Sequence, residues 1–304
     1  MKFNLIKHLT LTCLILLFIS FSGMSQKTQD TLNRKRLNGV IIGGTALYAT
    51  SMTALYHMWY KNYPQTNFHF FNDNDEWLLL DKCGHVTTSY AISTESYKIL
   101  RWTGLNEKKS ILYGGITGFV FQTVIETLDG FSEEWGASPG DIVANSLGSG
   151  IFITQQLVWH NQRVKVKWST HLTSFAKYRP DLLGNNAQER LLKDYNGQTF
   201  WLSANIKSFF PTSRLPKWFN IAIGYGGTGM TGATQNTLEH NNNPIPYFNR
   251  EPSFYLAPDI DFSKVKTNSK FLKFLFEGFG FLKTPSPTLE IKKNGSIVFH
   301  LIFF

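Results

Sequence analysis

Cysteine and charge are both scarce in this chain of 304 residues. The two cysteines are Cys13 and Cys83, and Cys13 lies in an apolar N-terminal stretch that we expect to be cleaved. A single remaining thiol can form no disulfide bond within the chain, even in an oxidising compartment. Charged residues make up 17% of the sequence, against about 25% in ordinary soluble proteins. This shortage, with 26 Phe, 12 Tyr and 8 Trp, fits a membrane or envelope surface, and a large soluble core is the alternative.

Several familiar motifs are also missing. The sequence has no H-E-x-x-H, no C-x-x-C and no P-loop, so it gives no sign of a zinc protease, a thiol oxidoreductase or a nucleotide-binding loop. The glycine-rich run at 224–229 lacks the G-K-[ST] that would make it a P-loop, and we interpret it as a strand end and loop. We therefore predict no cofactor and no metal site; metal ligation is disfavoured because only one histidine is well placed.

The net charge is positive without any run of basic residues. The formal charge is +9, and removing Lys2 and Lys7 with the leader leaves 9 − 2 = +7. A basic exported protein suits anionic lipid head groups. Without a basic run, and with an extracytoplasmic address, nucleic-acid binding is not expected.

Residues 1–25 have the layout of a secretory signal peptide. Two lysines precede the apolar run LTLTCLILLFISF, and small residues follow it, so we place cleavage after Ser25. An uncleaved anchor helix is the alternative, although the apolar run is short for a membrane span. Because Thr12 precedes Cys13, this cysteine is a poor site for lipid attachment.

The mature chain begins with a polar spacer and a segment free of charge. Residues 26–36 are basic and polar, whereas 37–60 contain no Asp, Glu, Lys or Arg. That length can cross a bilayer as a helix, with an aromatic belt at its end. A buried helix of a soluble bundle explains the same pattern. The loop that follows contains Pro64 and the NDND cluster.

Three further helices are predicted, at about 76–100, 107–128 and 138–160. Asn106 is a plausible N-cap, and Ser138, Pro139 and Asp141 fit a capped helix start with an S-x-x-D capping box. Gly114 and Gly118 have the spacing that lets another helix approach closely. We therefore predict a mainly α fold: a bundle of about four helices over 26–160, membrane-associated or membrane-embedded.

After residue 160 the sequence changes to a smaller, β-containing region, 161–304. Strands are expected at 198–206, 219–226 and 253–262, a long loop at 226–250 and a short amphipathic helix at 272–282. Asn294-Gly295 predicts a type I′ hairpin at the C-terminus. One face of its last strand would carry Ile297, Phe299, Leu301 and Phe303, and the other Val298, His300, Ile302 and Phe304. Both faces are largely apolar, which also resembles outer-membrane strands by analogy, although about eight strands are needed for such a barrel.

Polar residues at helical spacing mark the candidate site. Asp81 and His85 are four residues apart, and so are Asp141 and Asn145, whereas Glu126 and Asp129 are three apart; each pair shares one helix face. Buried charges must pair or bind something, so we expect these pairs to converge between the helices. The predicted polar cluster is Asp81, Lys82, His85, Glu126, Asp129, Asp141 and Asn145.

Each of these residues also has a structural explanation. Asp141 caps a helix, Lys82 neutralises Glu126 or Asp129, and His85 is a satisfied core histidine. Glu126 and Asp129 would close their helix before Gly130, and Cys83 would be inert packing. A functional cluster and a purely structural polar network are left as equal alternatives.

The ordered set of motifs resembles a known family. D-K-x-x-H at 81–85, E-x-x-D at 126–129 and S-x-x-D-[IL]-x-x-[ND]-x-x-G at 138–148 are similar to the YfiM-like family of predicted periplasmic lipoproteins, and more distantly to VanZ-like membrane proteins. The resemblance covers about 75–150 and implies an envelope address and a site, with no established activity. This chain departs from the family in lacking a lipobox cysteine and in carrying some 140 further residues.

These features predict an exported cell-envelope protein, with membrane lipid or an envelope protein as its partner. The first hypothesis is a non-enzymatic component that binds lipid or a membrane partner. The second is a lipid- or glycan-modifying hydrolase, in which His85 is the acid/base and Asp81 or Glu126 orients it or activates water. A structural helper of an outer-membrane complex is the third.

Overall fold

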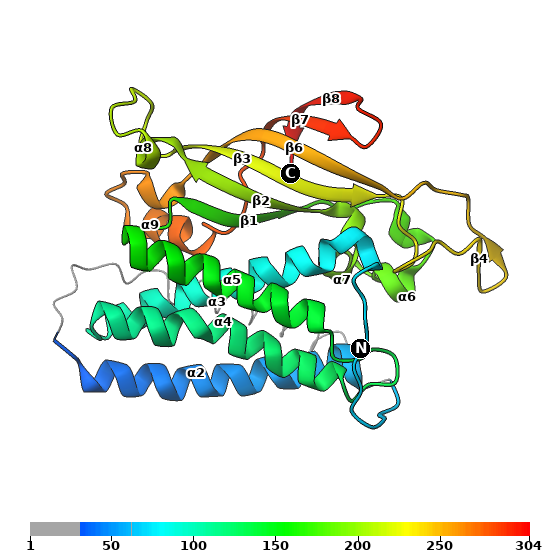
Figure 1. The fold of residues 1–304 in the computed structure, drawn as a ribbon, viewed down its shortest axis with the longest axis horizontal. Coiled ribbons are helices and arrows are strands. Elements are labelled where there is room, and N and C mark those ends of the chain that lie inside the picture. The colour runs from blue at the N-terminus through cyan, green and yellow to red at the C-terminus, as the bar shows by residue number, and fades with distance from the viewer. Residues whose placement is uncertain (1–30, 62) are drawn as a thin grey trace. The chain divides into compact units, whose positions relative to one another are not determined.

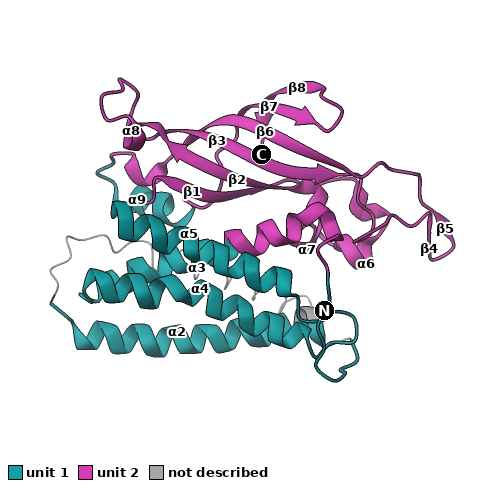
Figure 2. Cartoon of the chain, viewed as in Figure 1, with its two compact units in different colours: residues 1–72, 88–161, 267–279 teal, residues 73–87, 162–266, 280–304 magenta. Residues whose placement is uncertain are grey.

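The chain forms two compact units, and each contains segments that are distant in the sequence. In the computed structural model, residues 31–61 and 63–304 are described, so the predicted signal peptide lies outside the described residues. The helical unit takes in residues up to 72, 88–161 and 267–279, and the sheet unit takes in 73–87, 162–266 and 280–304 (Figure 2). The predicted domain boundaries stay predictions.

The helical unit contains the helices expected from the apolar periodicity. Its elements are α2 (Arg34–Leu55), a π-helical turn (Tyr56–Tyr60), α3 (Leu80–Trp102), whose first two turns belong to the sheet unit, α4 (Glu107–Asp129), α5 (Pro139–Trp159) and α9 (Lys270–Gly278). The predicted caps are confirmed, because Asn106 accepts from the backbone N–H of Lys109 and Ser138 accepts from that of Asp141. These side chains satisfy backbone donors that a helix start leaves unpaired.

The sheet unit is built on six antiparallel strands in the order β1-β2-β3-β6-β7-β8 (Figure 1). The strands are β1 (Val164–Thr170), β2 (Gln198–Asn205), β3 (Phe219–Thr228), β6 (Glu251–Ile260), β7 (Ser286–Lys292) and β8 (Ile297–Phe303), and β4 (Glu239–His240) pairs separately with β5 (Asn243–Pro244). Short helices α6 (Pro180–Leu183), α7 (Ala187–Lys193) and α8 (Ile206–Phe209) and 3₁₀ turns at 76–79, 175–177, 195–197 and 262–264 complete it. The backbone around Leu282 pairs with Trp168 and covers part of the outer edge of β1.

The prediction of a mainly α four-helix bundle is wrong. Eight α-helices are described, but a six-stranded antiparallel sheet forms the centre of the second unit, so the fold contains both helical and β architecture. The sequence pattern does not predict β1, because its lysines alternate with apolar residues and resemble a polar junction. Lys167 in fact points into the sheet unit and is fully buried, so the usual assignment of polar residues to the solvent side fails there.

The C-terminal hairpin forms, but its turn and one of its faces differ from the prediction. Lys292 accepts from the N–H of Gly295, which has φ of 82°, and its own N–H donates to Ser296. This is a type I turn followed by a left-handed residue, whereas type I′ needs positive φ at both central residues. A register shift opposite Ser286–Thr288 then moves Phe303 to the face of His300, where it stacks against Trp201 and Tyr255.

A left-handed turn leads into α3. Trp77, Leu78 and Leu79 have φ of 47°, 55° and 65°, a region that costs non-glycine residues about 1–2 kcal/mol each. The surrounding sheet unit holds the turn in place: the N–H of Trp77 donates to Ala233, and the Tyr225 hydroxyl donates to the carbonyl of Leu78 at 2.7 Å. The strain lies immediately before Asp81, and strained backbone of this kind clusters at functional sites.

Among the described residues, one helix is long and apolar enough to cross a membrane, and it is α4. The segment predicted as a candidate span, 37–60, corresponds to most of α2 and the π-helical turn after it. Core helices of soluble proteins include helices as long and as apolar as α4, so α4 alone does not establish a membrane-spanning segment.

Candidate functional site

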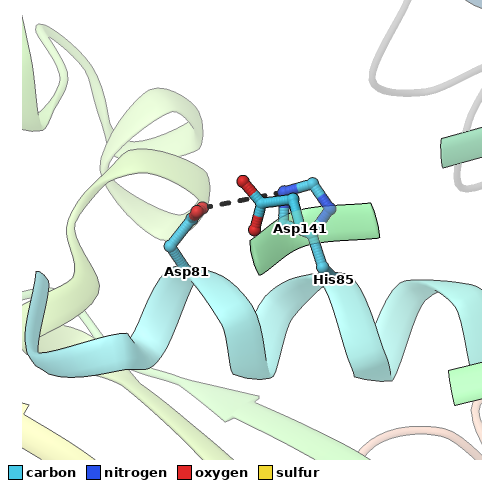
Figure 3. A group of neighbouring side chains, drawn as sticks. All are labelled: Asp81, His85 and Asp141. Carbon is cyan, nitrogen blue, oxygen red and sulfur yellow. Dashed lines mark ion pairs between the residues drawn. The ribbon is translucent and has the colours of Figure 1, made fainter. Parts of the chain in front are cut away.

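Asp81 and His85 form a carboxylate–imidazole pair on the first two turns of α3. Their side chains point the same way from the helix, and 3.9 Å separates the His85 Nε2 atom from the Asp81 Oδ1 atom (Figure 3). This distance is an ion-pair separation and is too long for a direct hydrogen bond. Both side chains are only partly exposed, at 15% for His85 and 24% for Asp81.

Two further groups fix the Asp81 carboxylate within the sheet unit. The Tyr195 hydroxyl donates to Oδ1 at 2.6 Å, and the Lys82 ammonium donates to Oδ2 at 3.2 Å. Burial acts to raise the pKa of Asp81, but the charges of His85 and Lys82 and the hydrogen bonds from Tyr195 and Lys82 hold this pKa below its ordinary value. Asp81 is therefore ionised at neutral pH and can orient the imidazole one turn away.

Lys82 has partners that the sequence analysis did not assign to it. Its ammonium lies 2.7 Å from Asp73 Oδ1, in the loop before α3, and 3.2 Å from Asp81. Within the sheet unit, Lys82 therefore neutralises Asp73 and Asp81, which are local acids; its predicted pairing with Glu126 or Asp129 stays a prediction. Cys83 packs beside the core of this unit, and burial raises the pKa of its thiol to about 11. It is therefore protonated at neutral pH, as expected of inert packing.

In the helical unit, Glu126 joins the end of α4 to the start of α5. Glu126 is 2% exposed, and its Oε2 atom accepts from the N–H of Ser138 at 3.2 Å. Ser138 in turn accepts from the N–H of Asp141 at 3.1 Å. The predicted bond from the Asp141 N–H to Ser138 is confirmed, and the N–H of Ser138 also donates to Glu126, twelve residues earlier; the return bond of the capping box to the Asp141 carboxylate stays a prediction.

Asp129 closes the same end of α4. Its Oδ1 atom accepts from the Tyr60 hydroxyl at 2.6 Å. Burial raises the pKa of Tyr60, and the charges of Asp129 and Glu126 raise it further. Tyr60 therefore remains a neutral donor at any physiological pH. Asn145 lies one turn after Asp141 in α5 and is fully buried.

Each unit thus brings together its own part of the predicted cluster. The sheet unit holds Asp81, Lys82 and His85, and the helical unit holds Glu126, Asp129, Asp141 and Asn145. Figure 3 also draws the side chain of Asp141, which belongs to the helical unit. Convergence of all the pairs into one site stays a prediction, as does the absence of a metal. If they do converge, two carboxylates and an imidazole would form a ligand set that divalent metals accept.

One further motif fits the sequence but not the local structure. Residues 136–140 read G-A-S-P-G, the spelling of a nucleophile elbow. Ser138, however, is 1% exposed, and its hydroxyl caps α5. No described strand leads into it, whereas an elbow stands between a strand and a helix.

The sequence pattern did not identify Tyr195 and Tyr60, which donate to Asp81 and Asp129, or Asp73, which pairs with Lys82. Asp73 sits in the NDND cluster, which was interpreted only as a loop, and no local pattern distinguishes it. Tyr195 is 114 residues from Asp81 and Tyr60 is 69 residues from Asp129. Only the tertiary fold could have identified them.

The region that contains the candidate site is similar to a known protein family. Residues 69–155 are similar to a family described as "Predicted periplasmic lipoprotein (DUF2279)". The matched range contains all seven residues of the predicted polar cluster. No curated protein and no solved structure gave a significant match to the chain. The similarity supports an exported, cell-envelope location, and its description carries no activity.

Proposed function

We propose that this protein is a non-enzymatic cell-envelope component that binds a lipid bilayer through the outer face of its six-stranded sheet. The outer face is defined by ten large apolar residues, each between 39% and 72% exposed: Leu202, Ile221, Ile223, Phe254, Leu256, Leu289, Ile291, Ile297, Phe299 and Leu301. The proposal extends the envelope location that the family similarity supports. It is also in keeping with the predicted resemblance to YfiM-like and VanZ-like proteins.

The outer face is continuous across five strands. The register pairs Leu202 with Ile223, Ile223 with Leu256, Leu256 with Leu289, and Leu289 with Phe299. A second row, two residues along each strand, runs from Phe254 to Ile291 and Ile297. Successive side chains of a strand point to opposite faces, so both rows lie on one side. A soluble monomer rarely exposes a continuous apolar patch larger than a few hundred Å².

The opposite face of the same sheet is buried, and charged residues lie on it beside an aromatic cluster that contains Trp201, Tyr255 and Phe303. Lys167 forms an ion pair with Asp259 at 2.7 Å, and both side chains are almost fully buried. Ser203 donates to Asp259 at 2.6 Å, and Glu290 lies 2.8 Å from His300. Buried charges on this face and exposed leucine, isoleucine and phenylalanine on the other are an inverted placement of these residue types relative to a water-soluble protein. This inversion is the observation on which the proposal rests.

The chemistry of the outer face favours lipid over a protein partner. Its ten residues have no hydrogen-bonding group, whereas protein interfaces combine an apolar centre with about one hydrogen bond per 100–200 Å². Acyl chains need no such partners, and an apolar face in contact with them leaves no polar group unsatisfied. A bilayer is therefore the occupant we propose.

Vesicle flotation tests this function. The exported protein, purified and mixed with phosphatidylcholine vesicles, should float with them, and it should sediment with membranes on cell fractionation without detergent. Replacing Ile223 and Leu256 together by Asp should weaken flotation roughly a hundredfold, because burying each side chain contributes about 1.5–3 kcal/mol. Because Ile223 and Leu256 are 57% and 42% exposed, these replacements should destabilise the fold only slightly.

A matched control separates this face from apolarity in general. Leu172 and Leu238 belong to the same unit, are 53% and 61% exposed and lie outside the six strands. Replacing both by Asp introduces the same charge and should change flotation less than twofold. Recovery of the native protein in the soluble periplasm, or equal loss in both variants, would refute bilayer binding and would favour a protein partner for the face.

One observation favours a second candidate, a hydrolase acting on lipid or glycan. An ionised Asp81 stands one turn from His85, directly after the left-handed turn, and Tyr195 and Lys82 hold it in place. In this proposal His85 acts as general acid/base and Asp81 orients it, while Glu126 and Asp141 would join them if the predicted convergence occurs.

His85→Gln tests the second candidate. Activity against a panel of phospholipids and peptidoglycan fragments should fall about 10²–10⁴-fold, the usual contribution of a general acid/base, with the unfolding midpoint unchanged. His160→Gln, which removes a 69% exposed histidine paired with Glu107, is the control and should leave turnover unchanged. No turnover by the native protein, or loss of folding in His85→Gln, would favour a structural network.

A further inference from the structure

We infer that one end of the six-stranded sheet, the basic–aromatic rim, selects anionic phospholipid head groups. The rim is defined by six residues in the segments where β2 ends, β3 begins and β6 ends: Phe210, Arg214, Leu215, Lys217, Trp218 and Lys266. All six are exposed. This inference rests on the proposed bilayer binding and names the lipid chemistry of the same surface.

Backbone and side-chain contacts hold the rim segments together. The N–H of Asp261 donates to the carbonyl of Trp218 at 2.8 Å, and the Asn205 side chain donates to the carbonyl of Lys217 at 2.8 Å. The Lys264 ammonium donates to Ser208 Oγ at 2.8 Å. The loop after α8 and the loop after β6 therefore form one connected surface at the ends of the strands.

The charge at this end is strongly positive. Residues 206–218 carry Lys207, Arg214 and Lys217 and no acid, and residues 261–266 carry Lys264 and Lys266 beside a single acid, Asp261. Asp261 is fully buried and lies 2.5 Å from Lys165 and 3.7 Å from Lys264. Its charge is thus already engaged by two lysines, and the exposed cations of the rim have no acid within these segments to balance them.

Aromatic and basic side chains occur here in the combination that suits a membrane interface. Phe210 is 63% exposed and Trp218 is 38% exposed. Aromatic rings favour the head-group level of a bilayer, and lysine and arginine extend along apolar surface to place their charge there. The rim lies next to the outer face at the start of β3, because Ile221 of the outer face comes three residues after Trp218 of the rim. The apolar face would thus meet acyl chains while the rim meets phosphate groups.

The test compares neutral and anionic vesicles. Adding phosphatidylglycerol to phosphatidylcholine vesicles should strengthen binding of the native protein, and high salt should remove the gain. In the variant Arg214→Gln/Lys217→Gln/Lys266→Gln, binding to the anionic vesicles should fall about a hundredfold, because each basic residue near the surface contributes about 1 kcal/mol. Binding to neutral vesicles should stay within twofold of native, since the outer face is untouched.

A second variant controls for net charge alone. Lys108→Gln/Lys109→Gln/Lys293→Gln removes the same charge from exposed lysines outside the rim and should keep the preference for anionic vesicles. An equal loss in the control, or unchanged anionic binding in the rim variant, would overturn the inference while leaving bilayer binding intact. If the native protein binds neither kind of vesicle, the proposed function itself fails. If it binds only the anionic vesicles and the rim variant loses that binding, the rim is supported and the outer face is not.

Discussion

Replacing Asp259 by Asn is expected to lower the free energy of unfolding of the sheet unit by about 3–5 kcal/mol, the usual cost of leaving a buried charge without its partner. Asp259 accepts two cations, with Lys167 Nζ at 2.7 Å and Lys283 Nζ at 3.8 Å. All three side chains are at most 1% exposed. Asparagine keeps much of the shape but removes the only negative charge of this group, so two buried ammonium groups would face each other uncompensated.

The free energy of unfolding that is lost in Asp259→Asn should vary with pH, because Lys283 titrates. Burial lowers the pKa of Lys283 from 10.5 to about 8; Asp259 opposes this shift and Lys167 adds to it. Between pH 8 and 10.5 the unfolded chain therefore binds more protons at this lysine than the folded chain, and its contribution to stability rises with pH. Once Lys283 is neutral it no longer needs Asp259. Without Asp259 the pKa of Lys283 falls further, so the stability deficit of Asp259→Asn relative to the native protein should shrink as the pH rises toward about 8 and stay level above it.

Urea unfolding followed by tryptophan fluorescence measures this effect, since Trp201 is buried in the same face, 5.0 Å from the Lys283 ammonium. The control is Asp181→Asn, which removes an acid that is 51% exposed and paired with Arg179 at 3.5 Å. An exposed pair contributes about 0–1 kcal/mol, so this variant should unfold almost as the native protein does. An Asp259→Asn deficit below about 1 kcal/mol, or one that grows above pH 8, would contradict the buried network.

The helices were predictable because their signals are local. Asn106, Ser138 and Pro139 stand at helix starts where their side chains or ring geometry satisfy the first turn, and α4 and α5 begin within one residue of the predicted positions. The strands with apolar centres, β2, β3 and β6, were also found. β1 was not, because its residues Lys165 and Lys167 point toward Asp261 and Asp259, acids 96 and 92 positions away in the chain.

The candidate site was predictable only to the level of residue pairs. The four-residue spacing places Asp81 and His85 on one helix face, and the structure confirms this pairing. The partners of the carboxylates could not be deduced in the same way. Glu126 reaches the N–H of Ser138 across a turn, and Tyr195 reaches Asp81 from the far part of the sheet unit. Spacing along one helix carries no information on bonds between elements.

Gly118→Ala is expected to destabilise the helical unit by about 3 kcal/mol, at the upper end of the usual cost of overpacking. A Cβ atom at Gly118 would lie 2.1 Å from the carbonyl oxygen of Ser89 and 2.7 Å from Ser93 Oγ, both on α3. Gly114, one turn earlier, would place its Cβ 2.5 Å from the backbone nitrogen of Tyr97. The small-xxx-small spacing of α4 therefore lies against the backbone of α3, which cannot give way as a flexible side chain could.

The same close approach of α3 and α4 allows a buried group of hydrogen bonds among α3, α4 and α5. Ser93 Oγ donates to the carbonyl of Gly115 at 2.6 Å, and Ser149 Oγ accepts from the N–H of Phe119 at 2.9 Å. Ser93 and Ser149 are themselves 3.0 Å apart. Moving α3 and α4 apart to admit a methyl group would lengthen these bonds and leave buried donors and acceptors poorly paired, which adds to the steric cost.

Gly150→Ala is the control, and the opposite sign is expected. No atom lies within 4 Å of the position that a Cβ would take at Gly150 in α5, so alanine should stabilise this helix by about 0.5–1 kcal/mol through its higher helix propensity. Unfolding of both variants under one set of conditions, followed by far-UV circular dichroism, compares them directly. If Gly118→Ala unfolds like the native protein, or if both changes shift stability in the same direction, α3 and α4 do not approach as closely as the backbone contact at Ser89 requires.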